Sequence, residues 1–285
     1  MISDITLGQF FPGNSVLHRL DPRTKIILSI FFMVTVFLAN TPISFLLLTL
    51  FTLMLIPVSK IAGSVIMKGI KPIVFILIFT SVINVFMTVG EGAPLVHFWF
   101  IRIYTEGIVR AVFMSLRVIL LIVGTSIFLT YTTSPISLTD GMESLLAPLK
   151  KLHIPVHVFS MMMTIALRFI PTLIEETEKI MNAQKSRGAD FTSGNLIKRA
   201  KALIPLIVPL FASSFKRAEE LAVAMECRCY RVDRDRTKLH KLSMGRADCL
   251  WFLIIALFFA AMLLLRSPRW YELPSPIINL LFYKI

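Results

Sequence analysis

The sequence is short of acidic residues and of cysteine. Asp and Glu number 17 against 30 Lys and Arg, a formal net charge of +13, and only 3 of the 285 residues are cysteines. Three cysteines cannot form the disulfide framework of a small secreted domain. No Asp or Glu occurs in the long apolar runs, so the sequence lacks the intramembrane carboxylates that act as proton relays in many pumps.

Nucleotide-binding and catalytic motifs are absent as well. The stretch from Gly63 to Lys68 comes nearest to a Gly-x-x-x-x-Gly-Lys-Ser/Thr phosphate loop, but it lacks the second glycine. Neither His-Glu-x-x-His nor Gly-x-Ser-x-Gly occurs. We therefore expect a chain that is not an enzyme, has no catalytic residues and binds no cofactor of its own.

Two small groups of residues resemble parts of a metal site. Cys227 and Cys229 form a Cys-x-Cys pair without a second pair, and His153 and His157 are four residues apart. Pro155 separates the histidines and no third ligand is evident, whereas zinc sites use three or four protein ligands. We expect no metal site, and we interpret both groups as small or polar residues at helix ends.

Apolar residues dominate the chain. Hydrophobic residues make up 56% of the sequence, and the mean hydropathy is +0.77, too apolar for an ordinary soluble domain. The composition predicts an all-α, polytopic membrane protein with about five transmembrane helices. The predicted spans are residues 25–39, 43–58, 72–89, 108–131 and 249–265.

The basic residues follow the positive-inside rule. They gather before the first span, between the second and third spans, and throughout residues 134–248, whereas the loop 90–105 has only Arg102. This pattern places the N-terminus and residues 134–248 in the cytoplasm and the C-terminus outside. We therefore attribute the positive charge to membrane topology and lipid contact, and we expect no nucleic-acid partner.

The predicted organisation has four parts. Residues 1–24 form a cytoplasmic N-terminal segment, 25–133 hold the first four spans, 134–248 form a cytoplasmic helical domain, and 249–285 hold the last span and an extracellular tail. Within 134–248, helical periodicity predicts two long helices, at about 155–187 and 196–228. The first carries charges that are costly at bilayer depth; these are Arg168, Glu175, Glu176 and Glu178.

Both long helices are predicted to end in the same format, an Arg between two small residues. The two motifs are Ser186-Arg187-Gly188 and Cys227-Arg228-Cys229. One Arg after a helix is ordinary, because cations favour helix C-termini. Two matched cationic tips in the cytoplasmic part of a membrane protein favour a role in docking, since Arg can make bidentate contacts in an acidic groove.

Arg117 is the deepest charge in the predicted spans. An intramembrane Arg marks either a functional site or a buried pair. We keep both interpretations open; the structural one would pair Arg117 with Asn84 or with a carbonyl on a neighbouring helix.

The sequence resembles a known family over nearly its whole length, the transmembrane (T) components of energy-coupling factor (ECF) transporters. The opening run at residues 8–25, GQFFPGNSVLHRLDPRTK, carries the most specific resemblance, and residues 168–171, RFIP, and the two Arg motifs also fit. The second motif departs from the family pattern, which often has Gly after the Arg, because Cys227-Arg228-Cys229 keeps only the Arg.

The resemblance implies a four-part vitamin transporter in a prokaryotic cell membrane. Two ABC-type ATPases, which bind ATP and Mg, would dock on Arg187 and Arg228, and an interchangeable membrane S component would bind the vitamin. Other possibilities are a T component of a dedicated cobalt, nickel or biotin system, a polytopic membrane enzyme, and a stand-alone carrier. The last two lack a catalytic constellation and inverted repeats, respectively.

A methionine-rich stretch is a candidate contact for the S component. Methionine surfaces can repack against different partners. The candidate residues are Met161, Met162, Met163, Ile165 and Phe169. The alternative is ordinary packing against the second long helix.

Overall fold

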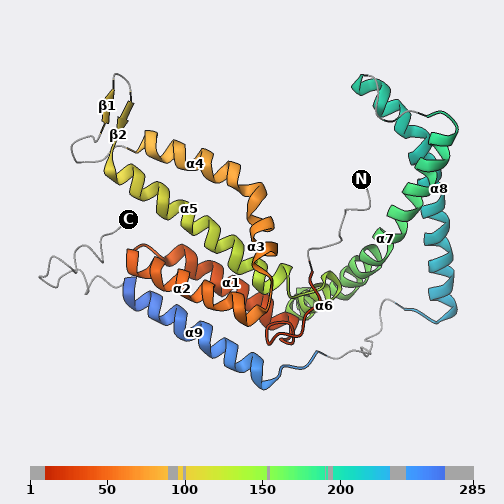
Figure 1. Ribbon diagram of the computed structural model, residues 1–285. Coiled ribbons are helices and arrows are strands. Elements are labelled where there is room, and N and C mark those ends of the chain that lie inside the picture. The colour runs from red at the N-terminus through yellow and green to blue at the C-terminus, as the bar shows by residue number, and fades with distance from the viewer. Residues whose placement is uncertain are drawn as a thin grey trace, which may run out of the picture. The chain divides into compact units, whose positions relative to one another are not determined.

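The computed structural model describes residues 10–88, 96–98, 101–152, 155–189, 191, 195–231 and 242–266. Within these residues the chain is helical except for one antiparallel hairpin, formed by β1 (Val96–Phe98) and β2 (Ile101–Ile103) (Figure 1). The predicted all-α class is confirmed. The hairpin falls in a stretch expected to be a loop, because three-residue strands are too short to show an alternating pattern.

The chain forms two compact units. The membrane unit comprises Gln9–Gly141 with Leu242–Ile285, and the long-helix unit comprises Met1–Gly8 with Met142–Lys241. The helices of the membrane unit are α1 (Pro22–Leu38), α2 (Pro42–Ser59), α3 (Gly63–Ile70), the 3-10 turn η1 (Lys71–Ile73), α4 (Val74–Met87), α5 (Thr105–Thr125), the π-helical turn η2 (Ser126–Thr130) and α9 (Arg246–Arg266). The long-helix unit holds η3 (Ala147–Leu152), α7 (Val156–Ser186) and α8 (Leu196–Cys227), and α6 (Pro135–Leu145) runs across the junction.

The first two helices begin with the same local signal, a polar cap followed by proline. The Asp21 carboxylate accepts a hydrogen bond from the Arg23 amide, and the Thr41 hydroxyl accepts one from the Ser44 amide. Both caps satisfy amides that have no partner inside the helix, and proline suits the first helical position because its nitrogen carries no hydrogen.

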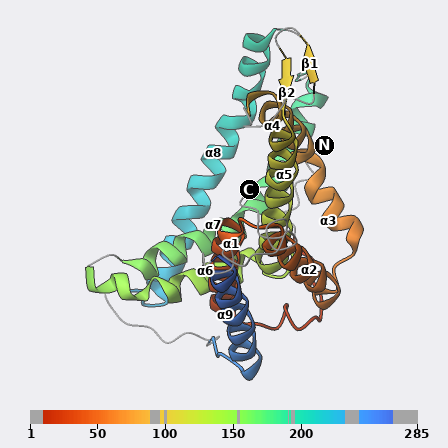
Figure 2. The ribbon, with the colours of Figure 1, turned by 90° about the vertical axis from the view of Figure 1, so that its left-hand side faces the viewer.

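Helix α1 lies at the centre of the membrane unit, against α5 on one side and α9 on the other (Figures 1 and 2). Its Phe32 is 1% exposed and packs against the rings of Phe51 and Phe128. On α5, Gly124 faces the same ring, and a Cβ atom there would fall well inside the van der Waals radius of Phe32. The missing side chain therefore lets α1 and α5 approach closely.

Five stretches of the described residues are long and apolar enough to cross a membrane. They are Pro42–Ser59, Gly63–Met87, Thr105–Thr130, Val156–Ser186 and Arg246–Leu265. Four of them overlap predicted spans, whereas the first predicted span forms α1, whose 17 residues extend about 25 Å, less than the ~30 Å hydrocarbon core. Val156–Ser186 qualifies by length and composition; its cytoplasmic placement stays a prediction that rests on its charges.

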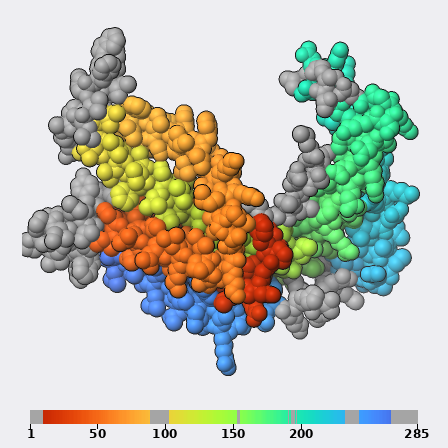
Figure 3. Space-filling view, in the orientation of Figure 1, coloured from red at the N-terminus to blue at the C-terminus, as the bar shows by residue number. Residues whose placement is uncertain are grey.

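In the long-helix unit, α7 and α8 contact each other over part of their length and cross at an angle (Figures 2 and 3). A polar contact joins them: the Glu176 carboxylate on α7 lies 2.6 Å from the Arg217 guanidinium on α8 and also accepts a hydrogen bond from the Ser213 hydroxyl. A stripe of α8 side chains remains exposed in this unit; it consists of Ile204, Val208, Phe211 and Phe215. The pair thus has an apolar surface that the unit itself does not cover.

Candidate functional site

The first Arg motif forms the C-terminal cap of α7. The Ala189 amide donates to the Gln184 carbonyl and the Gly188 amide donates to the Lys185 carbonyl, at 3.0 and 2.9 Å. This is the Schellman arrangement, in which the residue after the cap adopts a left-handed conformation. Gly188 has φ +88°, which glycine adopts without steric cost. Arg187 is the cap residue itself, so its side chain leaves the helix at its very end.

The second Arg motif forms the same cap on α8. The Tyr230 amide donates to the Met225 carbonyl and the Cys229 amide donates to the Glu226 carbonyl, at 3.0 and 2.8 Å. Arg228 again occupies the cap position, with φ −89° and ψ 13° against −87° and 5° for Arg187. The two tips therefore share one backbone geometry, although the residues around them differ.

Cys229 stands where the first tip has glycine. Its φ is +56°, and Lys60 is the only other non-glycine residue with positive φ in the described part of the chain. A side chain in this conformation costs roughly 1–2 kcal/mol, because Cβ approaches the following carbonyl oxygen. The departure from the family pattern thus leaves the fold of the cap unchanged but introduces local strain.

Both tips are open to solvent. Ser186, Arg187 and Gly188 are exposed, as are their counterparts in the second tip. Among the described residues, neither guanidinium has an ion pair or a hydrogen bond. A planar guanidinium on a rigid helix end, with small neighbours on each side, is suited to bidentate binding of a carboxylate. The two Arg tips can therefore present two equivalent cations to an acidic partner.

The strain at Cys229 gives a first testable prediction. Cys229→Gly should stabilise the α8 cap by about 1 kcal/mol, because glycine adopts φ +56° freely. Hydrogen–deuterium exchange of the peptide that contains the Tyr230 amide should slow about fivefold. Cys227→Gly is the matched control, and it should accelerate exchange, since it places glycine in the last helical turn. Equal exchange in both variants would contradict the assignment of strain.

The five candidate residues for the S-component contact divide between two surfaces. Ile165 and Phe169 line a groove of about 290 Å³ against α8, together with Leu221 and Met225. Met162 and Met163 are instead exposed, at 53% and 39%, and Met161 is partly buried. Ile165 and Phe169 thus face α8, whereas Met162 and Met163 face outward, and a contact of any of them with an S component stays a prediction.

Arg117 reaches the turn that joins α1 and α2. Its Nη2 atom lies 2.5 Å from the Ala39 carbonyl oxygen and 3.4 Å from the Asn40 side-chain oxygen, and its guanidinium lies 5.3 Å from the centre of the Phe45 ring. Asn84 bonds elsewhere, to the Thr80 carbonyl. The sequence offers Asn84 or a backbone carbonyl as a partner for Arg117, and the structure shows the carbonyl, that of Ala39. The contact provides this carbonyl, at the end of α1, with a hydrogen-bond donor.

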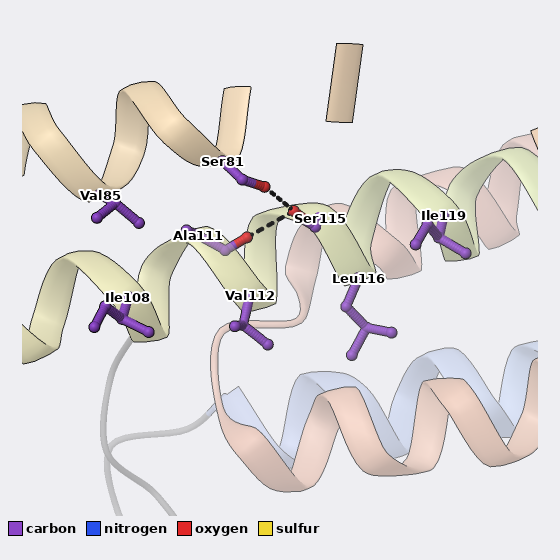
Figure 4. A pocket seen from close by; sticks show the side chains of 8 residues that line it. All are labelled: Ser81, Val85, Ile108, Ala111, Val112, Ser115, Leu116 and Ile119. Atoms are coloured by element: carbon purple, nitrogen blue, oxygen red, sulfur yellow. Dashed lines mark hydrogen bonds between the residues drawn. The ribbon is translucent and has the colours of Figure 1, made fainter. Parts of the chain in front are cut away.

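A shallow groove of about 450 Å³ lies between α4 and α5 (Figure 4). Its lining is apolar apart from Ser81 and Ser115, whose hydroxyls are 2.7 Å apart. Ser115 donates to the Ala111 carbonyl, so Ser81 must donate to Ser115 and both protons are used. No charged residue lines the groove. It therefore offers a solute no free polar group and suits an acyl chain or an apolar helix.

The histidines and cysteines do not gather into a metal centre in the described part of the chain. His157 lies 3.2 Å from Glu143, whereas His153 falls outside the described residues. Cys227 and Cys229 are both exposed with free thiols. No group of three or more potential ligands occurs among the residues that the structure describes.

Sequence reasoning missed a buried polar cluster at one end of the membrane unit. Lys25 and Asp21 belong to the opening run, and Asp248 begins the last helix; all three are at most 5% exposed. The Asp21 amide donates to the Asp248 carboxylate across 227 positions of sequence. A charge next to a predicted span is common, so Asp248 gave no signal that it would be buried.

Comparison with known proteins gives a consistent family. The family model CbiQ, cobalt transport protein, matches residues 13–239. The energy-coupling factor transporter transmembrane protein EcfT of Acidaminococcus fermentans is 53% identical over 266 residues, which cover 93% of this chain and 98% of that protein. EcfT of Ruminiclostridium cellulolyticum is 53% identical over 265 residues, with 93% and 98% covered. EcfT of Bacillus subtilis is 48% identical over 267 residues, with 94% and 100% covered.

These relatives are transmembrane proteins by name, and this chain has five helical stretches long and apolar enough to cross a membrane, as a multi-pass membrane protein does. The match extends through both Arg motifs and both units. The chain therefore belongs to the family of energy-coupling factor transporter transmembrane proteins, EcfT, within the wider CbiQ family.

Proposed function

We propose that this chain is the coupling subunit of an ECF-type transporter for vitamins. Its two tips, centred on Arg187 and Arg228, each dock on one of two cytoplasmic ABC-type ATPases, and its helices hold a membrane S component that binds the vitamin. The observation that carries the proposal is the shared Schellman cap on α7 and α8, with an exposed Arg at each cap position. Two equivalent tips suit a pair of equivalent partners.

The ATPases supply the energy, because this sequence has no phosphate-binding loop. ATP and Mg are bound by those partners, and this chain transmits their movement as a non-catalytic subunit. An acidic groove on each ATPase would match an exposed guanidinium in charge and in geometry.

The other function classes have less support. A stand-alone carrier needs a polar solute site at membrane depth, whereas the α4–α5 groove has only two hydroxyls, each already bonded. A membrane enzyme needs a catalytic constellation, and the sequence offers none.

A dedicated cobalt, nickel or biotin system differs from a vitamin system with exchangeable S components chiefly in those partners. The family description mentions cobalt, but relatives of about 50% identity over nearly the whole chain are named for energy coupling without a substrate. We therefore favour a coupling subunit whose S component sets the specificity.

The test is reconstitution. The purified chain alone should hydrolyse no ATP, and co-expression with the two ATPases should yield a complex with vanadate-sensitive hydrolysis. ATPases with a mutated phosphate-loop lysine provide the control for contamination. Hydrolysis by the chain alone, or an inability to retain the ATPases, would overturn the proposal.

A further inference from the structure

The chain passes into the long-helix unit within α6, after Gly141, and α9 follows in the membrane unit after the chain returns. The described residues of the membrane unit nearest these two passages contact the first turn of α1. Gly141 lies against Pro22 and Arg23, and Asp248 accepts a hydrogen bond from the Asp21 amide. The start of α1 thus contacts the chain both where it leaves the membrane unit and where it comes back.

Lys25 forms the first part of this contact. It is 2% exposed, and its ammonium donates to the Thr132 carbonyl at 2.8 Å and to the His18 carbonyl at 3.2 Å. Thr132 itself is 2% exposed and lies between η2 and α6. A buried ammonium therefore fastens α1 to the point where the chain departs towards the long helices.

Asp248, in the first turn of α9, forms the second part of this contact. One of its carboxylate oxygens accepts the Asp21 amide at 2.9 Å, and the other accepts the Gly245 amide at 2.7 Å. It is 4% exposed. A buried carboxylate without such partners would be strongly unfavourable, so this geometry is closely specified. Asp248 both caps α9 and fastens it to the start of α1.

Gly141 forms the third part. A Cβ atom at this position would lie 2.9 Å from Cβ and 3.2 Å from the carbonyl carbon of Pro22. Helix α6 therefore passes directly against the first turn of α1, at a distance that only glycine permits. This contact uses backbone and a rigid ring, neither of which can move aside easily.

We propose that these contacts, which we call the α1 clamp (Asp21, Pro22, Lys25, Thr132, Gly141 and Asp248), form the joint that transmits movement of the long-helix unit to the membrane unit. The inference rests on the proposed coupling function. The clamp residues are positioning residues: they touch neither ATP nor vitamin, and they hold α1, α6 and α9 together where force enters the membrane unit. Loosening the clamp uncouples hydrolysis from transport while the ATPases stay bound.

The test uses Gly141→Ala in the complete complex in proteoliposomes, with tritiated riboflavin and a riboflavin-binding S component as the probe. The added methyl group wedges α6 from Pro22, whereas the charges and the helix propensity of α6 are kept or improved. We expect normal retention of both ATPases, continued ATP hydrolysis, and about tenfold less riboflavin transported per ATP hydrolysed, within the range of coupling free energies between sites. Gly63→Ala is the matched control, because its Cβ would meet no atom within 4 Å and it lies outside the clamp.

Lys25→Met provides a second variant, with exposed Lys68→Met as its control. It leaves the Thr132 carbonyl without its donor and should reduce transport per ATP in the same way. Unchanged transport per ATP in Gly141→Ala would overturn the proposal, and so would loss of the ATPases from this variant, since the clamp would then serve assembly alone. Failure of the proposed function would show differently, as a wild-type complex that does not retain ATPases.

Discussion

A chain in which both Arg187 and Arg228 are replaced by alanine is expected to reach the membrane normally and to lose both ATPases on purification. Each replacement leaves an acidic groove of the partner without its cation, a loss of roughly 2–5 kcal/mol for a buried, hydrogen-bonded charge pair. The lower value already weakens docking about thirtyfold per tip. Co-purification measured by quantitative mass spectrometry and vitamin uptake should fall together.

The controls for this variant separate docking from general charge. Arg199→Ala removes an exposed Arg from the same unit and should leave co-purification unchanged. Replacing both tip residues with lysine should restore docking only in part, because an ammonium cannot reproduce the planar fork of a guanidinium. Full retention of both ATPases by the double alanine variant would mean that the tips are simply solvated helix ends.

Gly124→Leu is expected to be the most destabilising single change in the membrane unit. Its side chain would occupy the space of the Phe32 ring, which is 1% exposed and packed between α1, α2 and η2. Overpacking of a filled core costs about 1–3 kcal/mol or more of the free energy of unfolding. We expect a loss at the upper end of this range, because leucine would stand where two helices touch. The apparent Tm in detergent and the yield of folded protein should both drop sharply.

Gly63 provides a matched glycine, since a Cβ there meets no atom within 4 Å. Gly63→Leu should leave the apparent Tm within a few degrees of the wild-type value. Combining Gly124→Leu with Phe32→Ala should recover part of the lost stability, because the two changes compensate in volume. Simple addition of the two losses would show that Gly124 and Phe32 do not contact each other as described.

The long helices could be predicted from sequence to within about one residue. The predicted helices at 155–187 and 196–228 correspond to α7 (Val156–Ser186) and α8 (Leu196–Cys227). Their boundaries carry local signals, because Pro155 precedes the first helix and Gly188 supplies its left-handed cap. Helix boundaries set by such residues are a property of the local sequence.

The shared geometry of the two tips could be predicted only in part. The format Ser-Arg-Gly indicates a left-handed cap, whereas Cys-Arg-Cys does not, since cysteine has no preference for positive φ. The cap at Cys229 forms because its backbone hydrogen bonds to Glu226 and Met225 are retained despite the strain. That balance depends on the whole last turn of α8.

Contacts between distant parts of the chain could not be predicted. Asp248 meets Asp21 across 227 positions, and Gly124 meets Phe32 on another helix. Position along the sequence also misleads on one helix: Met162 and Met163 are neighbours of Ile165 but are exposed, whereas Ile165 and Phe169, four residues apart, share the face towards α8. Sequence spacing shows which residues share one face of a helix. It does not show what that face contacts, because that depends on how the helices pack.

The central claim, that each Arg tip docks on one ATPase, is tested most directly by photo-cross-linking from the tips themselves. A photoreactive amino acid at position 187 or at position 228 should each yield an adduct of this chain with one ATPase. A chain labelled at both positions should yield an adduct with two ATPases, and a probe at exposed position 199 should yield neither. Adducts that lack ATPase, or equal adducts from position 199, would contradict the account.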